Sequence, residues 1–325
     1  MQTMKDSQST IRNQEVAEAV LKGLSAEPKT LPSWLFYDET GDRLFQEIMR
    51  MPEYYPTRCE YDILQQHKEK LLKHFRERAR TFKLIELGAG DGLKTEILLR
   101  HFMGEGIDFT YLPIDISSHA LDALSQRLNT TLPGLRIQPL KKSYSEALKH
   151  MRSYDEKKII LFMGANIGNF TLHEACAFLS KLVIPLTAKD LLLIGFDLKK
   201  DPRIIQEAYD DPRGLTREFN LNILTRLNRE LGADFPAAEF SHFPYYDPET
   251  GTTKSFLMSM KDQAIRFSAL DRTIRFDQWE TIQTEVSQKY DVRMIEKLLA
   301  LSGLRIVEVF YDNQKYFCDV LVKPL

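Results

Sequence analysis

The chain has 325 residues, 43% of them hydrophobic and 28% charged, which is typical of a soluble globular enzyme with one large domain or two smaller ones. The formal net charge of −2 provides no basic surface of the kind that nucleic-acid-binding proteins carry, so we expect no nucleic-acid partner. Three widely spaced cysteines (Cys59, Cys176 and Cys318) predict neither a disulfide framework nor a metal site, and they fit a reducing compartment.

The polar segment Met1–Asn13 lacks the apolar region of a signal peptide, and we expect it to be disordered. No apolar run approaches the roughly 18 residues that a membrane-spanning helix needs. We therefore expect a monomeric, cytoplasmic protein without a membrane partner.

Helical spacing of apolar residues marks the first part of the chain. It predicts one helix over Val16–Leu24, a second over Leu44–Met49 that ends before Pro52, and a long amphipathic helix over Glu60–Arg78.

Strand and helix patterns then alternate. The predicted strands are Phe82–Leu87, Phe109–Ile116, Arg136–Leu140 (weak), Lys158–Met163 and Leu191–Phe196, and the predicted helices between them are Lys94–Phe102, Ser118–Leu128, Ser145–Met151 and Leu172–Leu182. Because the strands are apolar without alternation, we expect a parallel sheet covered on both faces. The segment from Asp201 to Gln288 departs from this rhythm, first helical and then rich in strands. A helix over Val292–Ser302 and strands over Arg305–Tyr311 and Phe317–Val322 end the chain.

The segment Leu84–Thr95 contains an acid, Glu86, followed by glycines at positions 88, 90 and 92. Glycines at a strand-to-helix turn allow positive φ angles and close approach of a nucleotide-like ligand. A dinucleotide site would need a third glycine inside the helix, where this chain has Leu93. The spacing instead resembles that of S-adenosylmethionine (SAM)-dependent methyltransferases, although a tight turn in another α/β protein remains an alternative. We predict SAM as the cofactor and no metal.

Three charged residues near this turn are candidates for cofactor binding. Asp115, at the end of the second strand, could accept hydrogen bonds from ribose hydroxyls or cap the next helix, a role that Ser117 or Ser118 could also fill. Glu86 could stabilise the cationic methionine end of SAM. Lys94 opposes the helix dipole, so it either holds the cofactor carboxylate or is an exposed surface lysine.

The fourth strand leads into Met163–Asn169, where Gly164 and Gly168 alternate with Asn166 and Asn169. Asparagines offer both donors and acceptors, so this strand end is a candidate site for the acceptor substrate, with an ordinary strand-to-loop transition as the alternative.

Four further segments are specific in combination. They are Trp34–Gly41 with Met51–Arg58, Gly164–Asn169, Ala208–Asp211 through Phe219–Asn220, and Thr284–Tyr290. From Leu31 to its end, the chain resembles the ergothioneine-pathway histidine Nα-methyltransferases, which trimethylate L-histidine to hercynine.

The resemblance implies site residues. Substrate carboxylate contacts fall on Asn169 and Tyr209, the imidazole-reading pair on Glu285 and Ser287, and a tyrosine near the substrate amine on Tyr54, with Tyr55 possible if the register shifts by one. Tyr37 falls near the cofactor and, with Tyr54, is a candidate catalytic residue, and Gly88, Gly90, Lys94, Asp115 and Gly164 fall at the cofactor. Independently, Glu285 and Ser287 are two residues apart and would share one face of a strand, where a carboxylate and a hydroxyl could pair with both imidazole nitrogens; a surface edge strand is the structural alternative.

Two positions depart from the family pattern. Ser143-Tyr144 stands where the family has an acid and an aromatic residue that hold adenine, so Ser143 offers a weaker hydroxyl contact. A family methionine of the imidazole pocket is replaced near Ser255 or Phe256, which leaves a different amino-acid substrate open.

The predicted fold is α/β, a Rossmann-like class I methyltransferase core with a mostly parallel seven-stranded sheet and a terminal antiparallel hairpin, plus a mixed α+β substrate lobe. Residues 59–200 and 291–325 would form the core, and residues 1–58 and 201–290 the substrate lobe. The predicted function is SAM-dependent trimethylation of the L-histidine α-amino group. The alternatives are methylation of another amino acid, a non-catalytic SAM-binding protein, and a nicotinamide-dependent dehydrogenase.

Overall fold

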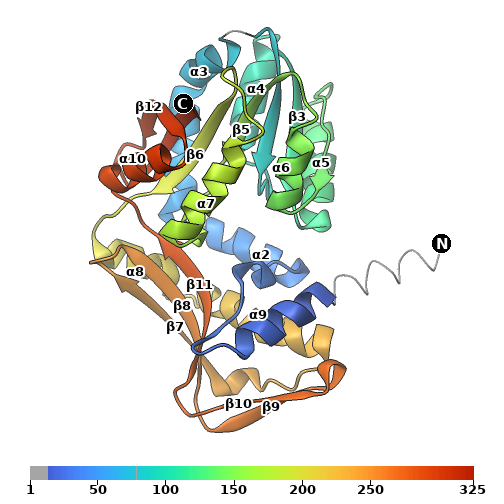
Figure 1. The fold of residues 1–325 in the computed structure, drawn as a ribbon, viewed down its shortest axis with the longest axis vertical. Helices are drawn as coiled ribbons and strands as arrows, with labels where there is room; N and C mark the ends of the chain where they lie inside the picture. The colour runs from blue at the N-terminus through green and yellow to red at the C-terminus, as the bar shows by residue number, and fades with distance from the viewer. Residues whose placement is uncertain (1–13, 78) are drawn as a thin grey trace, which may run out of the picture. The chain divides into compact units, whose positions relative to one another are not determined.

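The structure is a computed structural model that describes residues 14–77 and 79–325. The expected disorder of Met1–Asn13 lies outside these residues. The described chain divides into two compact units (Figure 1). We call Tyr54–Lys200 with Gln288–Leu325 the core unit, and the described residues up to Glu53 with Asp201–Ser287 the second unit.

The core unit is built on a seven-stranded sheet in the order β12-β13-β6-β5-β2-β3-β4. Its strands are β2 (Thr81–Leu87), β3 (Asp108–Asp115), β4 (Leu140–Lys141), β5 (Lys157–Phe162), β6 (Leu191–Asp197), β12 (Leu304–Tyr311) and β13 (Phe317–Pro324). Strands β2 to β6 are parallel, whereas β13 runs antiparallel to both β6 and β12. The chain order reverses at β2, which lies between β5 and β3, and such a reversal is where doubly wound folds bind their ligands. This topology confirms the predicted Rossmann-like class I methyltransferase fold.

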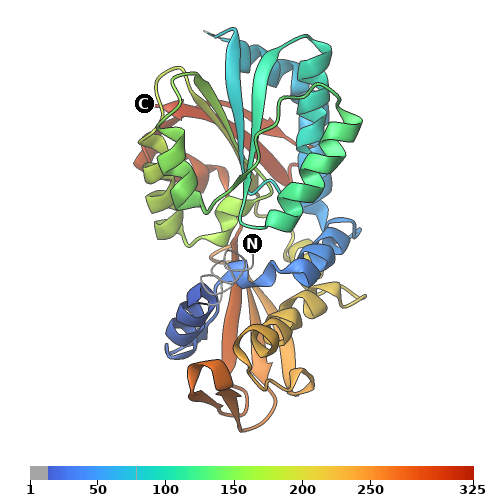
Figure 2. The same cartoon turned by 90° about the vertical axis from the view of Figure 1, so that its right-hand side faces the viewer.

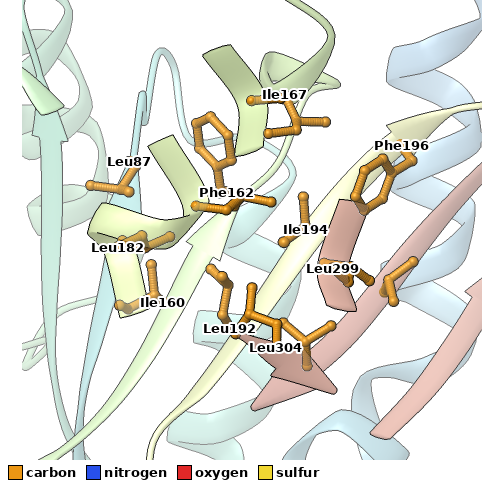
Figure 3. Close-up of a cluster of buried hydrophobic side chains, with 14 of the residues drawn as sticks. Leu87, Ile160, Phe162, Ile167, Leu182, Leu192, Ile194, Phe196, Leu299 and Leu304 are labelled. Atoms are coloured by element: carbon orange, nitrogen blue, oxygen red, sulfur yellow. The ribbon is translucent and has the colours of Figure 1, made fainter. Parts of the chain in front are cut away.

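Helices cover both faces of this sheet (Figure 2). They are α3 (Tyr55–Arg76), α4 (Thr95–Gly104), α5 (Ser118–Thr131), α6 (Tyr144–Met151), the 3-10 helix η2 (Asn166–Asn169), α7 (Leu172–Val183) and α10 (Val292–Leu301). Helix α3 packs against α4 and β13, while α10 packs against α7 and β12. Side chains of β5 and β6 such as Phe162 and Ile194 are fully buried in the cluster of Figure 3. The continuous burial of β5 and β6 follows from their apolar sequences.

Three expected elements differ from the structure. Helix α2 begins at Glu39 and not at Leu44, because the Asp38 carboxylate caps it by accepting from the N–H of Gly41. Helix α3 begins at Tyr55 and not at Glu60, because Pro56 occupies the first helical turn, where its missing N–H costs no hydrogen bond. The weak strand expected at Arg136–Leu140 is reduced to β4 (Leu140–Lys141) and an isolated bridge from Ile137 to Tyr111.

The second unit contains a four-stranded sheet in the order β1-β11-β8-β7 and a separate β9–β10 hairpin. The strands are β1 (Lys29–Thr30), β7 (Phe240–Asp247), β8 (Thr252–Ser259), β9 (Gln263–Phe267), β10 (Arg272–Phe276) and β11 (Thr281–Gln288). Residues 14–24 are helical, and the other helices are η1 (Ser33–Phe36), α2 (Glu39–Met49), α8 (Pro202–Tyr209), α9 (Leu215–Leu231), η3 (Ala237–Glu239) and η4 (Ser268–Leu270). Helix α9 packs against α2, β7 and β8, so this unit is a mixed α+β structure. Among all helices in the described part of the chain, none combines the length and hydrophobicity that crossing a membrane requires.

Candidate functional site

The glycine-rich turn after β2 adopts the conformation that the sequence predicts. Gly88, Gly90 and Gly92 have φ angles of 73°, 53° and 63°, which are unfavourable for residues with a Cβ. A Cβ at Gly92 would lie 2.4 Å from a Leu124 methyl group, whereas a Cβ at Gly90 would have no neighbour within 4 Å. Gly92 therefore allows Leu124 to pack closely against the turn, and Gly90 leaves the main chain open to a ligand.

Asp115 ends β3 next to this turn. Its carboxylate accepts hydrogen bonds from the backbone N–H of Gly90 at 3.0 Å and of Ser117 at 2.9 Å. The N-cap of α5 is Ser117, whose hydroxyl accepts a hydrogen bond from the N–H of Ala120. The helix-capping alternative for Asp115 is therefore wrong, and its binding of ribose remains a prediction.

Glu86 is buried beneath the turn. One carboxylate oxygen accepts a hydrogen bond from the Thr95 hydroxyl at 2.6 Å, and the other accepts one from the Tyr111 hydroxyl. Burial raises the pKa of Glu86 to about 7 despite these two donors. In the structure Glu86 thus joins β2, β3 and the start of α4, and its predicted contact with the methionine end of SAM is not tested.

Lys94 forms an ion pair with Glu60, a carboxylate of α3 that is fully buried. The lysine side chain is only 18% exposed, so the surface-lysine alternative is wrong. Burial by itself would lower the pKa of Lys94, but the charge of Glu60 outweighs it and holds that pKa above its usual value. Lys94 is therefore a charged group close to the glycine-rich turn.

Glu60 also fixes the strand end after β5. Its two carboxylate oxygens accept hydrogen bonds from the N–H of Gly164 at 2.8 and 3.0 Å. Gly164 has a φ of 73°, and a Cβ there would lie 3.5 Å from the Lys94 ammonium nitrogen. Two predicted cofactor residues, Lys94 and Gly164, are thus brought together by a third residue that the sequence analysis missed.

The asparagine-rich strand end forms η2, which follows Ala165 in a left-handed conformation with a φ of 57°. Asn166 donates to the carbonyl of Met163 at 2.8 Å, and Asn169 ends the helix with an exposed side chain. Tyr290, the last residue of the segment Thr284–Tyr290, donates to the carbonyl of Ile167 at 3.2 Å. This local order holds Asn169 at a defined position, and its predicted contact with the substrate carboxylate is not tested.

Ser143 and Tyr144 lie at the start of α6. Ser143 forms a capping box with Glu146, in which the Ser143 hydroxyl accepts from the Glu146 N–H and the Glu146 carboxylate accepts from the Ser143 N–H; the hydroxyl also donates to this carboxylate at 2.8 Å. A hydrogen bond from Ser143 to adenine would therefore compete with the helix cap. The Tyr144 ring packs edge-on against Phe162, and a Cβ at Gly88 would lie 3.0 Å from the Tyr144 hydroxyl oxygen. Tyr144 thus borders the glycine-rich turn.

The two adjacent tyrosines of the Pro-Glu-Tyr-Tyr-Pro segment have different environments. Tyr54 is the half-buried N-cap residue of α3. Tyr55 is buried and donates to the Asp197 carboxylate, with oxygen distances of 2.8 and 2.9 Å. Lys200 and Lys289 pair with the same carboxylate. Since Tyr55 has a structural role in this cluster, Tyr54 remains the residue that we predict at the substrate amine.

In the second unit, Tyr37 lies between η1 and α2. Its ring packs edge-on against Phe45 and Phe219, with centroid distances of 5.7 and 5.9 Å, and Phe36 stacks on Phe219 at 4.4 Å. Tyr209 is the half-buried last residue of α8. Each tyrosine thus has a fixed place at the end of a helix.

Glu285 and Ser287 lie on β11, as the sequence predicts. Glu285 is half-buried, Ser287 is 5% exposed, and the Glu285 carboxylate accepts a hydrogen bond from the Ser255 hydroxyl of β8 at 3.1 Å. The surface Glu and Ser of the structural alternative are therefore wrong, because both residues are partly or fully covered. That Glu285 and Ser287 bind the imidazole of a substrate stays a prediction.

Comparison with known proteins identifies the family. Residues 16–324 match the family described as histidine-specific methyltransferases, SAM-dependent. The chain is 34% identical to a histidine N-alpha-methyltransferase of Mycobacterium tuberculosis over 90% of each chain, and 35% identical to one of Mycolicibacterium smegmatis over 88% of each. It is also 29% identical to ergothioneine biosynthesis protein 1 of Schizosaccharomyces pombe, over 82% of this chain and 37% of that protein.

The chain belongs to this family. It is a SAM-dependent methyltransferase. The two alternative interpretations, a nicotinamide-dependent dehydrogenase and a non-catalytic SAM-binding protein, are therefore wrong. The glycine turn of the methyltransferase fits the cofactor, because Gly90 leaves its backbone open while Asp115 and Lys94 place one acceptor and one cation beside it.

Sequence reasoning missed two buried acids of the methyltransferase. Glu60 shares the apolar face of α3 with Ile63 and Leu64, three and four residues further on, and an acid on such a face is a signal of a buried partner. Asp319 is fully buried near Glu60, and burial together with the Glu60 charge raises its pKa well above the usual value. Asp319 is therefore a second buried acid near Glu60, and its raised pKa favours its protonated form.

Proposed function

We propose that this protein transfers methyl groups from SAM to the α-amino group of L-histidine and continues to the trimethylated product, hercynine. The observation that carries the proposal is the position of Glu285 and Ser287, two residues apart on β11, in a chain 34–35% identical to two histidine N-alpha-methyltransferases. The similarity to an ergothioneine biosynthesis protein supports a role of the product in ergothioneine formation.

Residues of the core unit would hold the cofactor. Gly88, Gly90 and Gly164 give access to the backbone, Asp115 would accept hydrogen bonds from the ribose hydroxyls, and Lys94 would pair with the cofactor carboxylate. Glu86, Ser143 and Tyr144 complete the proposed set in this unit, and the resemblance adds Tyr37 as a residue near the cofactor. When bound, SAM supplies an electrophilic methyl group on a sulfonium centre.

Substrate recognition would use polar groups of fixed position. Asn169 and Tyr209 would donate hydrogen bonds to the substrate carboxylate, Glu285 would accept the imidazole N–H, and the Ser287 hydroxyl would pair with the second ring nitrogen. A site that hydrogen-bonds a substrate group rejects analogues without that group far more strongly than an apolar pocket does. This donor and acceptor set is complementary to L-histidine.

The protein has little covalent chemistry to perform, so catalysis consists mainly of positioning the amine in a water-poor site. The amine must be neutral to react, and an α-amino group titrates at about 8 in peptides. The neutral Tyr54 hydroxyl can hold the amine without stabilising its ammonium form, as a carboxylate would. The nitrogen loses one proton to water before each transfer, because only the neutral amine reacts, and methylation ends at three because a quaternary nitrogen has no lone pair. The aromatic faces of Tyr37 and Tyr54 would tolerate the growing cation, whereas Phe36, expected to do the same, is buried and stacked on Phe219.

The test is incubation of the protein with SAM and each of the twenty amino acids, followed by mass spectrometry. We expect products of histidine that carry one, two and three added methyl groups, and little product from the other amino acids. Faster methylation of another amino acid would replace histidine as the substrate, and accumulation of a dimethylated end product would refute trimethylation.

One observation favours a second candidate, methylation of a different amino acid. The family's pocket methionine is replaced near Ser255 or Phe256, and of these two residues Ser255 contacts Glu285 directly. The shorter side chain changes the shape of the proposed pocket, and the same amino-acid panel distinguishes the two candidates.

A further inference from the structure

Ser255 is a buried serine whose hydroxyl reaches a proposed substrate-binding residue. It lies on β8, next to β11 in the four-stranded sheet, and is 1% exposed. Its Oγ donates to Oε2 of Glu285 at 3.1 Å. The contact joins the side chains of two neighbouring strands. The position of the Glu285 carboxylate on β11 therefore depends on Ser255 of β8.

The backbone around this contact is fixed as well. The Thr284 hydroxyl, one residue before Glu285, lies 3.1 Å from the Ser255 carbonyl oxygen and 2.7 Å from Oδ1 of Asn220. Asn220 is in turn held by a hydrogen bond from its side-chain nitrogen to the carbonyl of Thr216 in α9. Ser255 therefore presents its hydroxyl from a rigid position, and the Glu285 backbone is tied to the same network.

A hydroxyl donor has two effects on a carboxylate. It favours the ionised form, which accepts hydrogen bonds and cannot donate them. It also restricts the rotation of the carboxyl group, while the two oxygens of a carboxylate together have enough lone pairs for a second donor. Glu285 held in this way is prepared to accept the N–H of an imidazole with little loss of side-chain entropy.

We propose that Ser255 is a positioning residue for substrate selection, whose hydroxyl holds the Glu285 carboxylate oriented toward the imidazole N–H of histidine. This inference rests on the proposed function, in which Glu285 binds the imidazole. The serine hydroxyl would thus contribute to substrate selectivity, whereas an apolar side chain at this position could only fill space.

The test compares two ligands in the presence of S-adenosylhomocysteine, by calorimetry. L-histidine has the imidazole N–H, and β-(2-thienyl)-L-alanine has a ring of similar size without it. We expect Ser255→Ala to weaken histidine binding about tenfold, as the loss of one hydrogen bond to a charged group predicts, and to leave thienylalanine binding unchanged. Ser255→Thr, which keeps the hydroxyl, should restore histidine binding to within about twofold of the wild type.

A matched control is available on the same strand. The Thr253 hydroxyl is buried and has no hydrogen-bond partner among the residues that the structure describes. Thr253→Val removes a buried hydroxyl without removing a hydrogen bond, and should leave the ratio of the two dissociation constants unchanged. Ser255→Cys, of similar volume but a weak donor, gives a second measurement if the alanine variant is poorly folded, and should behave as Ser255→Ala does.

Equal weakening of both ligands by Ser255→Ala and Ser255→Cys would overturn the proposal, because it would show a structural role only. Unchanged histidine binding in both variants would overturn it too. If Glu285→Ala weakens histidine binding while the Ser255 variants do not, the positioning role fails and the proposed function stands. If the wild-type protein does not prefer histidine over thienylalanine, the proposed function itself fails.

Discussion

The Glu60 carboxylate accepts hydrogen bonds from the backbone N–H of Gly164 and forms an ion pair with Lys94. One buried residue of α3 thus fixes both the strand end after β5 and the cation beside the glycine-rich turn. The proposed cofactor site therefore depends on a residue that makes no proposed contact with the cofactor.

The first prediction follows from this relationship. Glu60→Gln keeps an acceptor for Gly164 but removes the ion-pair partner of Lys94, and breaking a buried pair in this way typically costs about 3 kcal/mol. We expect a lower free energy of unfolding in urea and weaker SAM binding by calorimetry. Glu69→Gln, an exposed change on the same helix, should alter neither quantity. Normal SAM affinity in the Glu60 variant would contradict a role in cofactor binding.

The second prediction concerns Asp115. Asp115→Ala should weaken SAM binding by about 1–3 kcal/mol, the range expected when hydrogen bonds to a charged group are lost. Part of this loss would arise because the Asp115 carboxylate no longer accepts the hydrogen bond from the Gly90 N–H that fixes the turn. Titration calorimetry with SAM measures the change, and Asp122→Ala, at an exposed site of α5, is the control. An unchanged affinity would remove Asp115 from the cofactor site.

The third prediction tests Asn169 and Tyr209. Histamine has the imidazole and the amine of histidine but no carboxylate, so it would leave the proposed carboxylate donors without an acceptor. We expect methylation of histamine to be slower by a factor of at least about 100, measured as kcat/KM by mass spectrometry. Comparable rates for the two amines would show that Asn169 and Tyr209 do not bind a carboxylate.

The fourth prediction concerns selectivity. Glu285→Ala should reduce activity on histidine more than activity on phenylalanine or tryptophan, because Glu285 would pair with the imidazole N–H, whereas phenylalanine has no ring N–H and the indole N–H of tryptophan belongs to a larger ring system. The measured quantity is the ratio of kcat/KM values in competition assays. Arg275→Ala, an exposed change in the β9–β10 hairpin, should leave the ratio unchanged. Histidine loses its assignment as the substrate if the ratio is the same in Glu285→Ala and wild type.

The fifth prediction concerns stability and pH. Burial raises the pKa of Glu86 to about 7 from the usual 4.5, so between these pH values the folded state binds more protons than the unfolded state. The free energy of unfolding contributed by Glu86 therefore falls as the pH rises through this range, by about 3 kcal/mol in total.

Glu86→Gln removes this titration. The difference between its free energy of unfolding and that of the wild type should rise between pH 4.5 and pH 8, as measured by urea denaturation at several pH values. This trend is expected even if the two proteins differ in stability at every pH. Glu105→Gln, at the exposed end of α4, should run parallel to the wild type. Parallel curves for Glu86→Gln would show that its pKa is not raised.

Much of the fold was predictable from the sequence, because periodicity and glycine spacing are local properties. The apolar runs of β5 and β6, the positive φ angles at Gly88, Gly90 and Gly92, and the antiparallel β12–β13 pair all follow from short segments. The family was predictable for the same reason, since its motifs are contiguous.

Only the tertiary structure decided which side chains meet. Glu60 and Gly164 are 104 residues apart, and Ser255 and Glu285 are 30 apart, so neither contact has a local signature. The structure also separated Tyr55, tied to Asp197, from Tyr54, two neighbours that sequence alone treats alike. The physical reason is that burial sets the charge and the hydrogen-bond partner of a polar side chain, and burial depends on elements distant in the chain.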